Sequence, residues 1–222
     1  CSYTQNPENC VTLADFGGKN TCVDEGEPAS AGDCFARAWS RAGFMGRQLR
    51  ERVAAGRMKM MHVVNKMVFV HAGVTPDALQ YLEQQDNFQG DYVEAMNQRA
   101  AEAISSNRIN DFVIRDKHPD GPTWTINHKD SREHTCADVR RVLAALGARR
   151  MVKGHIPQRD GATWFCDGQL VLTDTYMSQG FIINHKRKDS ERRLLALETS
   201  TEGSEVWFAY PMREESARCV EG

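Results

Sequence analysis

Two histidines stand at the same kind of junction, where a largely apolar segment ends and a glycine-containing turn follows. His71 comes after Val68-Phe69-Val70, and His155 comes after Met151-Val152-Lys153-Gly154. In open α/β sheets, functional groups gather beyond the carboxyl ends of the strands. Imidazole is a common ligand of zinc, iron or manganese, so two such turns side by side would bring two nitrogens to one ion. A single strand-end histidine is more often structural, and that alternative stays open for each.

The segments around these histidines predict alternating strands and helices. The run 67–70 is apolar throughout, which is typical of a central strand covered on both faces. Residues 58–64 predict its hairpin partner, joined by a turn at Asn65-Lys66. Helices are expected over 76–85, opened by Pro76-Asp77, and over 92–104, with 110–115 as a continuation or a short second piece. The segment 150–153 predicts the strand that leads to His155.

The remaining pattern completes a mixed α/β (α+β) chain. One or two helices are expected over 34–55, and a helix over 137–146, capped by Thr135 and ended by Gly147. A hairpin turning at Asp167-Gly168 joins strands 163–166 and 170–173, and further strands are expected at 180–184, 194–198 and 205–210. The predicted organisation is an irregular segment 1–33, a domain 34–211 and a loose charged tail 212–222.

The composition excludes several classes of function. The chain has 222 residues, of which 41% are hydrophobic and 26% charged, a balance typical of a soluble protein with a core. The formal net charge of -2 gives no basic field for nucleic acid, so no nucleic-acid partner is expected. No apolar run reaches the length that crosses a bilayer, so no membrane span is expected.

The seven cysteines show no CxxC pair, the spacing typical of zinc and redox sites. Free thiols in a reducing compartment are the favoured interpretation, and disulfides among the first four (Cys1, Cys10, Cys22, Cys34) are the alternative. Cys136 and Cys166 fall in or near regular structure, which favours buried, inert thiols.

Six short segments, taken in order along the chain, match a set of known motifs. Residues 69–73 are similar to FVHGG, 152–158 to VVGHTPQ, 122–125 to PVWTR, 174–180 to DVGMSRG, 44–50 to PLGRWLR and 11–18 to YVTPEEFAAFGG. With these motifs the chain resembles the phosphoprotein phosphatases, which are calcineurin-like metallophosphoesterases, and their Shewanella-like branch in particular. The resemblance covers about residues 12–184. It is the set, rather than any single motif, that is specific.

The resemblance implies a β-sandwich flanked by helices and a site with two divalent metal ions (Mn, Fe or Zn) bridged by a water that attacks phosphorus. Matched position by position, His71 and His155 would be metal ligands. Asp174 and Ser178 would be weaker candidates for binding substrate. The arginine expected after Trp124-Thr125 is Ile126 here, and His128 or Lys129 could replace it, although a solvated loop position is the simpler interpretation for both.

The departures from the family pattern matter as much as the matches. The GDxH, GDxxD and GNHE segments, which supply the family's other metal ligands and its general acid, do not occur in this sequence. The resemblance therefore implies the C-terminal half of a phosphatase domain, inactive by itself. It would need an N-terminal half, a second chain or a larger assembly to complete the fold and to bind the two metals. The alternative is a pseudophosphatase that serves as a structural or accessory subunit.

Overall fold

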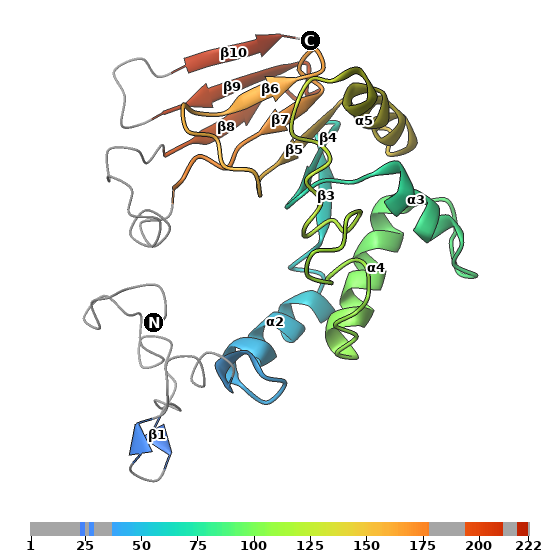
Figure 1. The fold of residues 1–222 in the computed structure, drawn as a ribbon, viewed down its shortest axis with the longest axis vertical. Helices are drawn as coiled ribbons and strands as arrows, with labels where there is room; N and C mark the ends of the chain where they lie inside the picture. Colours follow the sequence, from blue (N-terminus) through green and yellow to red (C-terminus); the bar gives the residue numbers. More distant parts are fainter. Residues whose placement is uncertain (1–22, 25–26, 29–36, 178–193, 211–216, 222) are drawn as a thin grey trace. The chain divides into compact units, whose positions relative to one another are not determined.

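The computed structural model describes the backbone of residues 23–24, 27–28, 37–177, 194–210 and 217–221, and the side chains of 37–177 and 194–210. The chain divides into two compact units. One consists of Cys1–Met58 with Ser178–Asp189, and the other of Lys59–Met177 with Ser190–Gly222. The second unit contains both strand-end histidines, and its elements are labelled in Figure 1.

In the first unit, a short antiparallel pair, β1 (Val23–Asp24) and β2 (Glu27–Pro28), lies within the segment predicted to be irregular. The helix α2 (Phe44–Ala54) lies within the predicted helical region. Its first turn approaches the preceding chain closely, because a Cβ atom at Gly46 would lie 2.0 Å from the Ser40 carbonyl oxygen. The Arg50 guanidinium donates to the carbonyls of Ser40 and Arg41, which holds this turn against the helix.

A five-stranded mixed sheet forms the centre of the second unit, in the order β3-β4-β5-β7-β6. Its strands are β3 (Met61–Val64), β4 (Met67–Val70), β5 (Arg150–Lys153), β6 (Thr163–Phe165) and β7 (Leu170–Leu172). The pairs β4–β5 and β5–β7 are parallel, whereas β3–β4 and β6–β7 are antiparallel hairpins. The apolar strand β4 is interior to the sheet, as predicted, and β3 of the same chain occupies its other side.

Both hairpin turns need left-handed backbone. Asn65 and Lys66 have φ values of 50° and 55°, which suit the two-residue turn type that matches the twist of paired strands. Cys166, Asp167 and Gly168 follow with φ values of 54°, 53° and 79° between β6 and β7. The predicted positions of both turns are confirmed.

A second, antiparallel sheet, ordered β10-β9-β8, packs on one face of the first. It consists of β8 (Ala196–Thr199), β9 (Glu205–Ala209) and β10 (Ala217–Glu221). Between the sheets, Met67, Val152 and Val171 form one apolar cluster with Val206 and Phe208. The strand β10 lies in the tail that was expected to be loose, so that expectation is wrong. All five of its residues pair with β9.

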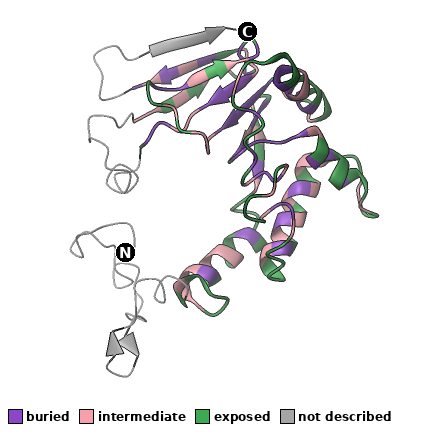
Figure 2. Ribbon diagram, viewed as in Figure 1, coloured by how far each residue is buried: buried purple, intermediate pink, exposed green. Residues whose placement is uncertain are grey.

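Three helices cover the opposite face of the five-stranded sheet, and Figure 2 shows buried residues along the strands and on one side of each helix. They are α3 (Pro76–Glu83), α4 (Tyr92–Ser105) and α5 (Glu133–Ala145). The side chains of Thr75 and Asp91 accept hydrogen bonds from the first turns of α3 and α4, which explains why these helices begin where they do. The result is the predicted α/β class, with two packed sheets flanked by helices.

Two helix predictions are corrected. Helix α5 begins at Glu133 with Arg132 as its N-terminal cap, so Thr135 is not the cap. Thr135 is buried, and its hydroxyl donates instead to the Asp130 carboxylate at 3.0 Å. Residues 110–115 form turns rather than more helix. The strand expected at 180–184 lies outside the described residues.

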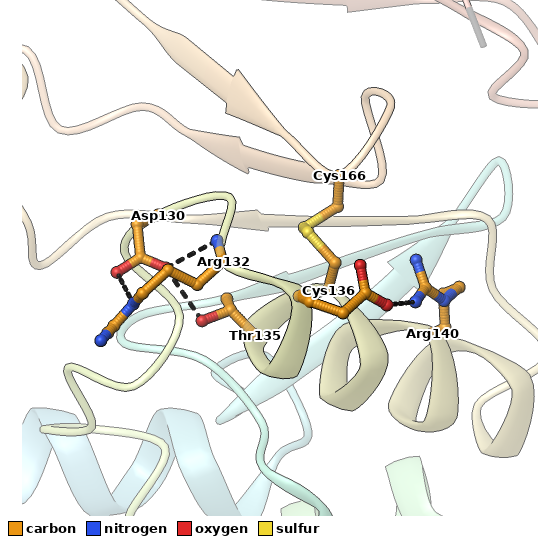
Figure 3. Close-up of a disulfide and its surroundings, with 7 residues drawn as sticks. Asp130, Arg132, Thr135, Cys136, Arg140 and Cys166 are labelled. Carbon is orange, nitrogen blue, oxygen red and sulfur yellow. Dashed lines mark hydrogen bonds and ion pairs between the residues drawn. A yellow bond between two sulfur atoms is a disulfide. The ribbon is translucent and has the colours of Figure 1, made fainter.

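Cys136 on α5 and Cys166 in the β6–β7 turn form a disulfide, with their Cα atoms 5.2 Å apart (Figure 3). The prediction that these two are inert free thiols is therefore wrong. Both residues are buried, as expected, but they lie next to each other and are bonded. The bond joins the helical layer to the sheet. Within the part of the chain that the structure describes, no helix has the length and apolar character needed to cross a membrane.

Candidate functional site

The register of two parallel strands brings the histidine turns together. Val70, the last residue of β4, pairs with Lys153, the last residue of β5. The ladder continues one step further, because the Gly154 amide donates to the His71 carbonyl at 2.9 Å. Both histidines thus leave the sheet at the same edge, as the sequence predicted.

The two imidazoles converge. Nε2 of His71 lies 3.2 Å from Nδ1 of His155, and the rings meet edge to face with centroids 5.1 Å apart. His155 adopts a left-handed backbone with φ of 65°, a conformation that costs a non-glycine residue roughly 1–2 kcal/mol. Such strain is typical of positions where the side chain must point in one required direction.

Both imidazoles are held in the neutral form. Burial lowers the pKa of His71, the Lys153 charge lowers it further, and the Asp174 carboxylate opposes this. Burial also lowers the pKa of His155, with smaller contributions from His71 and Lys153, against a hydrogen bond to the Trp124 backbone and the Asp174 charge. Neutral imidazole is the form that offers a lone pair to a metal ion.

We use the name Trp124 loop for residues 122–129, which lie against both histidine turns. The Ala72 amide, next to His71, donates to the Pro122 carbonyl at 2.8 Å. The Trp124 ring contacts the His155 ring edge to face, with centroids 5.1 Å apart. Ile126, which stands where the sequence resemblance implied an arginine, is 52% exposed and offers no charge.

Beneath this loop lies a buried pair of nitrogen side chains. Lys153 is 1% exposed, and its Nζ donates to the backbone carbonyl of His128 at 2.9 Å. His128 is also 1% exposed, so the expectation of a solvated loop position is wrong. Burial, followed by the Lys153 charge, lowers the pKa of His128 to about 4, and burial lowers that of Lys153 to about 8.

Sequence reasoning did not single out Lys153, although a signal was present. A lysine at the end of the apolar run Met151-Val152 is unusual in a central parallel strand, whose residues are covered on both faces. Lys129, the other suggested replacement for the arginine, is exposed.

The weaker candidates divide between the described and undescribed parts of the chain. The Asp174 charge acts on both histidines, and its backbone carbonyl accepts from the Gln158 amide at 2.7 Å. Ser178 lies outside the described residues. Across the stretches for which side chains are described, no three His, Cys, Asp or Glu residues are grouped so that they could hold a metal ion.

The histidine pair nevertheless fits two positions around one ion. Zinc–imidazole bonds of about 2.0–2.1 Å at a tetrahedral angle place two nitrogens roughly 3.3 Å apart. The observed separation of 3.2 Å matches this, although it also suits an N–H···N hydrogen bond between neutral rings. An open depression of about 390 Å³ at this edge is lined by His62, Phe69, His71, Gly154 and Thr173, among other residues. His71 is therefore reached from this depression, whereas His155 is not among its lining residues.

The fold is similar to that of solved phosphatases. A cold-active protein-tyrosine phosphatase of a psychrophilic Shewanella species has a TM-score of 0.60 at 12% identity, and the match covers 88% of this chain and 54% of that chain. Another structure of a cold-active protein tyrosine phosphatase has a TM-score of 0.58 at 14% identity, with the same coverage.

No family model matches this chain. An uncharacterised protein of Schizosaccharomyces pombe is 28% identical over 123 residues, which are 51% of this chain and 32% of that protein. The chain thus spans about half the length of the solved structures and about a third of this curated relative. Its two packed sheets, with helices on one side, form a phosphatase-like α/β fold.

Proposed function

We propose that this chain is the C-terminal half of a metal-dependent phosphoester hydrolase of the calcineurin-like type, and that His71 and His155 are two ligands of one of its metal ions. The observation that carries the proposal is the convergence of Nε2 of His71 and Nδ1 of His155 at 3.2 Å. Their position beyond two parallel strands, their neutral state and the phosphatase-like fold support it.

The residues of this chain have limited roles in that chemistry. When bound, divalent ions supply a hydroxide nucleophile and neutralise phosphate oxygens. His71 and His155 would hold one ion by neutral nitrogens, and the Asp174 carboxylate adds negative charge beside them. The remaining ligands would come from a segment or chain that completes the domain.

A second candidate is a pseudophosphatase that keeps the fold as a structural or accessory subunit. Ile126 favours it, because this exposed aliphatic side chain stands where the resemblance implies a phosphate-binding arginine. A neutral side chain cannot make the bidentate contacts by which arginine holds phosphate.

The experiment is to assay the full-length product of the gene that encodes this sequence against p-nitrophenyl phosphate in the presence of Mn²⁺. The hydrolase proposal expects turnover that His71→Ala and His155→Ala each abolish, while the exposed His134→Ala on α5 retains it. Turnover that survives both substitutions would exclude the proposed ligand role. Absence of turnover despite Mn²⁺ binding through the pair would favour the pseudophosphatase.

A further inference from the structure

The Trp124 loop holds the two histidine turns together, yet its own side chains anchor it poorly. Among residues 37–177 and 194–210, the buried side-chain polar atoms without a hydrogen-bond partner are Thr123 Oγ1 and both ring nitrogens of His128. All three belong to this loop. Leaving such groups unpaired costs roughly 1–3 kcal/mol each, so other contacts must keep the loop in place.

Those contacts are made at three points. Near the start of the loop, the Pro122 carbonyl accepts from the Ala72 amide beside His71. In the middle, Trp124 contacts the His155 ring and hydrogen-bonds to it through the backbone. Near the end, the His128 carbonyl accepts from Lys153 Nζ, two residues before His155.

The last anchor is unusual because it uses a buried ammonium group. Desolvation of an ammonium is costly, and burial lowers the pKa of Lys153 to about 8. The surrounding space is narrow: a Cβ atom at Gly73 would lie 3.3 Å from His128 Nδ1 and 3.6 Å from Lys153 Nζ. The lysine is therefore directed at the loop and the turn after His71.

The orientation of the His155 ring depends on the loop. Nδ1 of His155 faces His71, the Trp124 ring lies edge to face against the same imidazole, and the Trp124 backbone is a hydrogen-bond partner of that ring. A hydrogen bond from Nε2 fixes the proton on that nitrogen and leaves the Nδ1 lone pair directed at His71. Histidines that bind metals are commonly held in one tautomer by such a hydrogen bond from the other ring nitrogen. If the loop moved away, the proton of His155 could reside on either ring nitrogen, and the residue would become a mixture of two tautomers.

We propose that Lys153 is a positioning residue: by its hydrogen bond to the His128 carbonyl it holds the Trp124 loop so that His155 presents Nδ1 toward His71. The role deepens the proposed metal site. Because the test uses metal-free protein, the positioning role can be refuted while the hydrolase proposal stands. Equally, the positioning role can be confirmed even if the chain proves not to be part of a hydrolase.

The test is the tautomer of His155, read from long-range ¹H–¹⁵N correlation spectra at a pH where both imidazoles are neutral. The parent chain should show one dominant tautomer, protonated at Nε2. Lys153→Met, which removes the donor, should give a mixture, and Lys153→Arg should restore the single form in part. Lys129→Met, an exposed lysine of the same loop, is the matched control and should match the parent.

A second variant reaches the same loop without changing any charge. Gly73→Ala pushes against His128 and should give the same mixture of tautomers. The proposal fails if Lys153→Met leaves the tautomer of His155 unchanged. It also fails if Gly73→Ala leaves that tautomer unchanged, because the loop would then not control the ring.

A measurement on the parent chain does not depend on any variant folding. A buried ammonium bound to a carbonyl should show slowly exchanging Nζ protons and a coupling from Nζ to the His128 carbonyl carbon. Fast exchange, as for a surface lysine, would overturn the proposal.

Discussion

Nε2 of His71 and Nδ1 of His155 lie 3.2 Å apart, although 84 positions separate the two residues in the sequence. Two imidazoles satisfy only half of a tetrahedral site. The isolated chain should therefore bind Co²⁺ weakly and hydrolyse no phosphoester. His71→Ala and His155→Ala should each remove that weak binding, and the double variant should lose nothing more. Calorimetric titration measures this, with His134→Ala as the control, and tight binding of two ions would contradict it.

The disulfide between Cys136 and Cys166 should contribute measurably to stability. It closes a loop of 30 positions, for which the loss of unfolded-state entropy corresponds to about 3.6 kcal/mol. The variant with both cysteines changed to serine should lose about that much free energy of unfolding in urea. A reductant should lower the stability of the parent and leave this variant unaffected. Equal alkylation of both cysteines in the parent, with and without reductant, would show that the bond does not form.

Acid should destabilise the chain through His128. Burial holds its pKa at about 4 in the folded state, against an ordinary value of 6.5. Between these values the unfolded chain takes up a proton that the folded chain does not, so stability is full above pH 6.5 and falls as the pH is lowered. The loss should be at most about 3.4 kcal/mol.

His128→Gln should flatten this part of the stability curve, whereas the exposed His134→Gln should leave it as in the parent. Urea unfolding followed across this pH range gives the comparison. Parallel curves for the parent and His128→Gln would contradict the buried neutral imidazole.

Substitution of two glycines by alanine should distinguish the cost of backbone strain from the cost of a steric clash. Gly147 and Gly203 have similar φ values of 60° and 64°, but a Cβ atom at Gly147 meets nothing within 4 Å, while one at Gly203 would lie 2.1 Å from the Asn65 carbonyl. Gly147→Ala should cost about 1 kcal/mol for the left-handed conformation alone. Gly203→Ala should cost roughly 1–3 kcal/mol more, because the β3–β4 turn must move. Equal midpoints in urea would refute this separation.

Local patterns predicted most of the sheet and the meeting of the two histidines. The apolar run at β4, the turn at Asn65-Lys66 and the junctions before His71 and His155 are signals within a few residues, and parallel strand ends share one edge. The sequence did not predict the pairing of Cys136 with Cys166, because cysteines 30 positions apart carry no motif.

The sequence also did not predict which polar side chains are buried. Whether His128 is solvated depends on where the Trp124 loop packs, and the spacing of polar residues in a loop does not determine that. Likewise, β10 lies in a charged tail. It is a strand because it pairs with β9, and local composition does not predict such a tertiary contact.

The register of β4 against β5 has a consequence for recognising related chains. Helices α3, α4 and α5 all lie between the two histidines in sequence, yet the pairing of Val70 with Lys153 brings the two histidine turns to the same edge of the sheet. Insertions or deletions between α3 and α4, away from the Trp124 loop, would leave the pair intact, whereas one extra residue inside either strand would turn its side chains to the other face. Homologues should therefore differ widely in the length of the intervening segment, and searches should weight the two strand-to-histidine junctions rather than their separation.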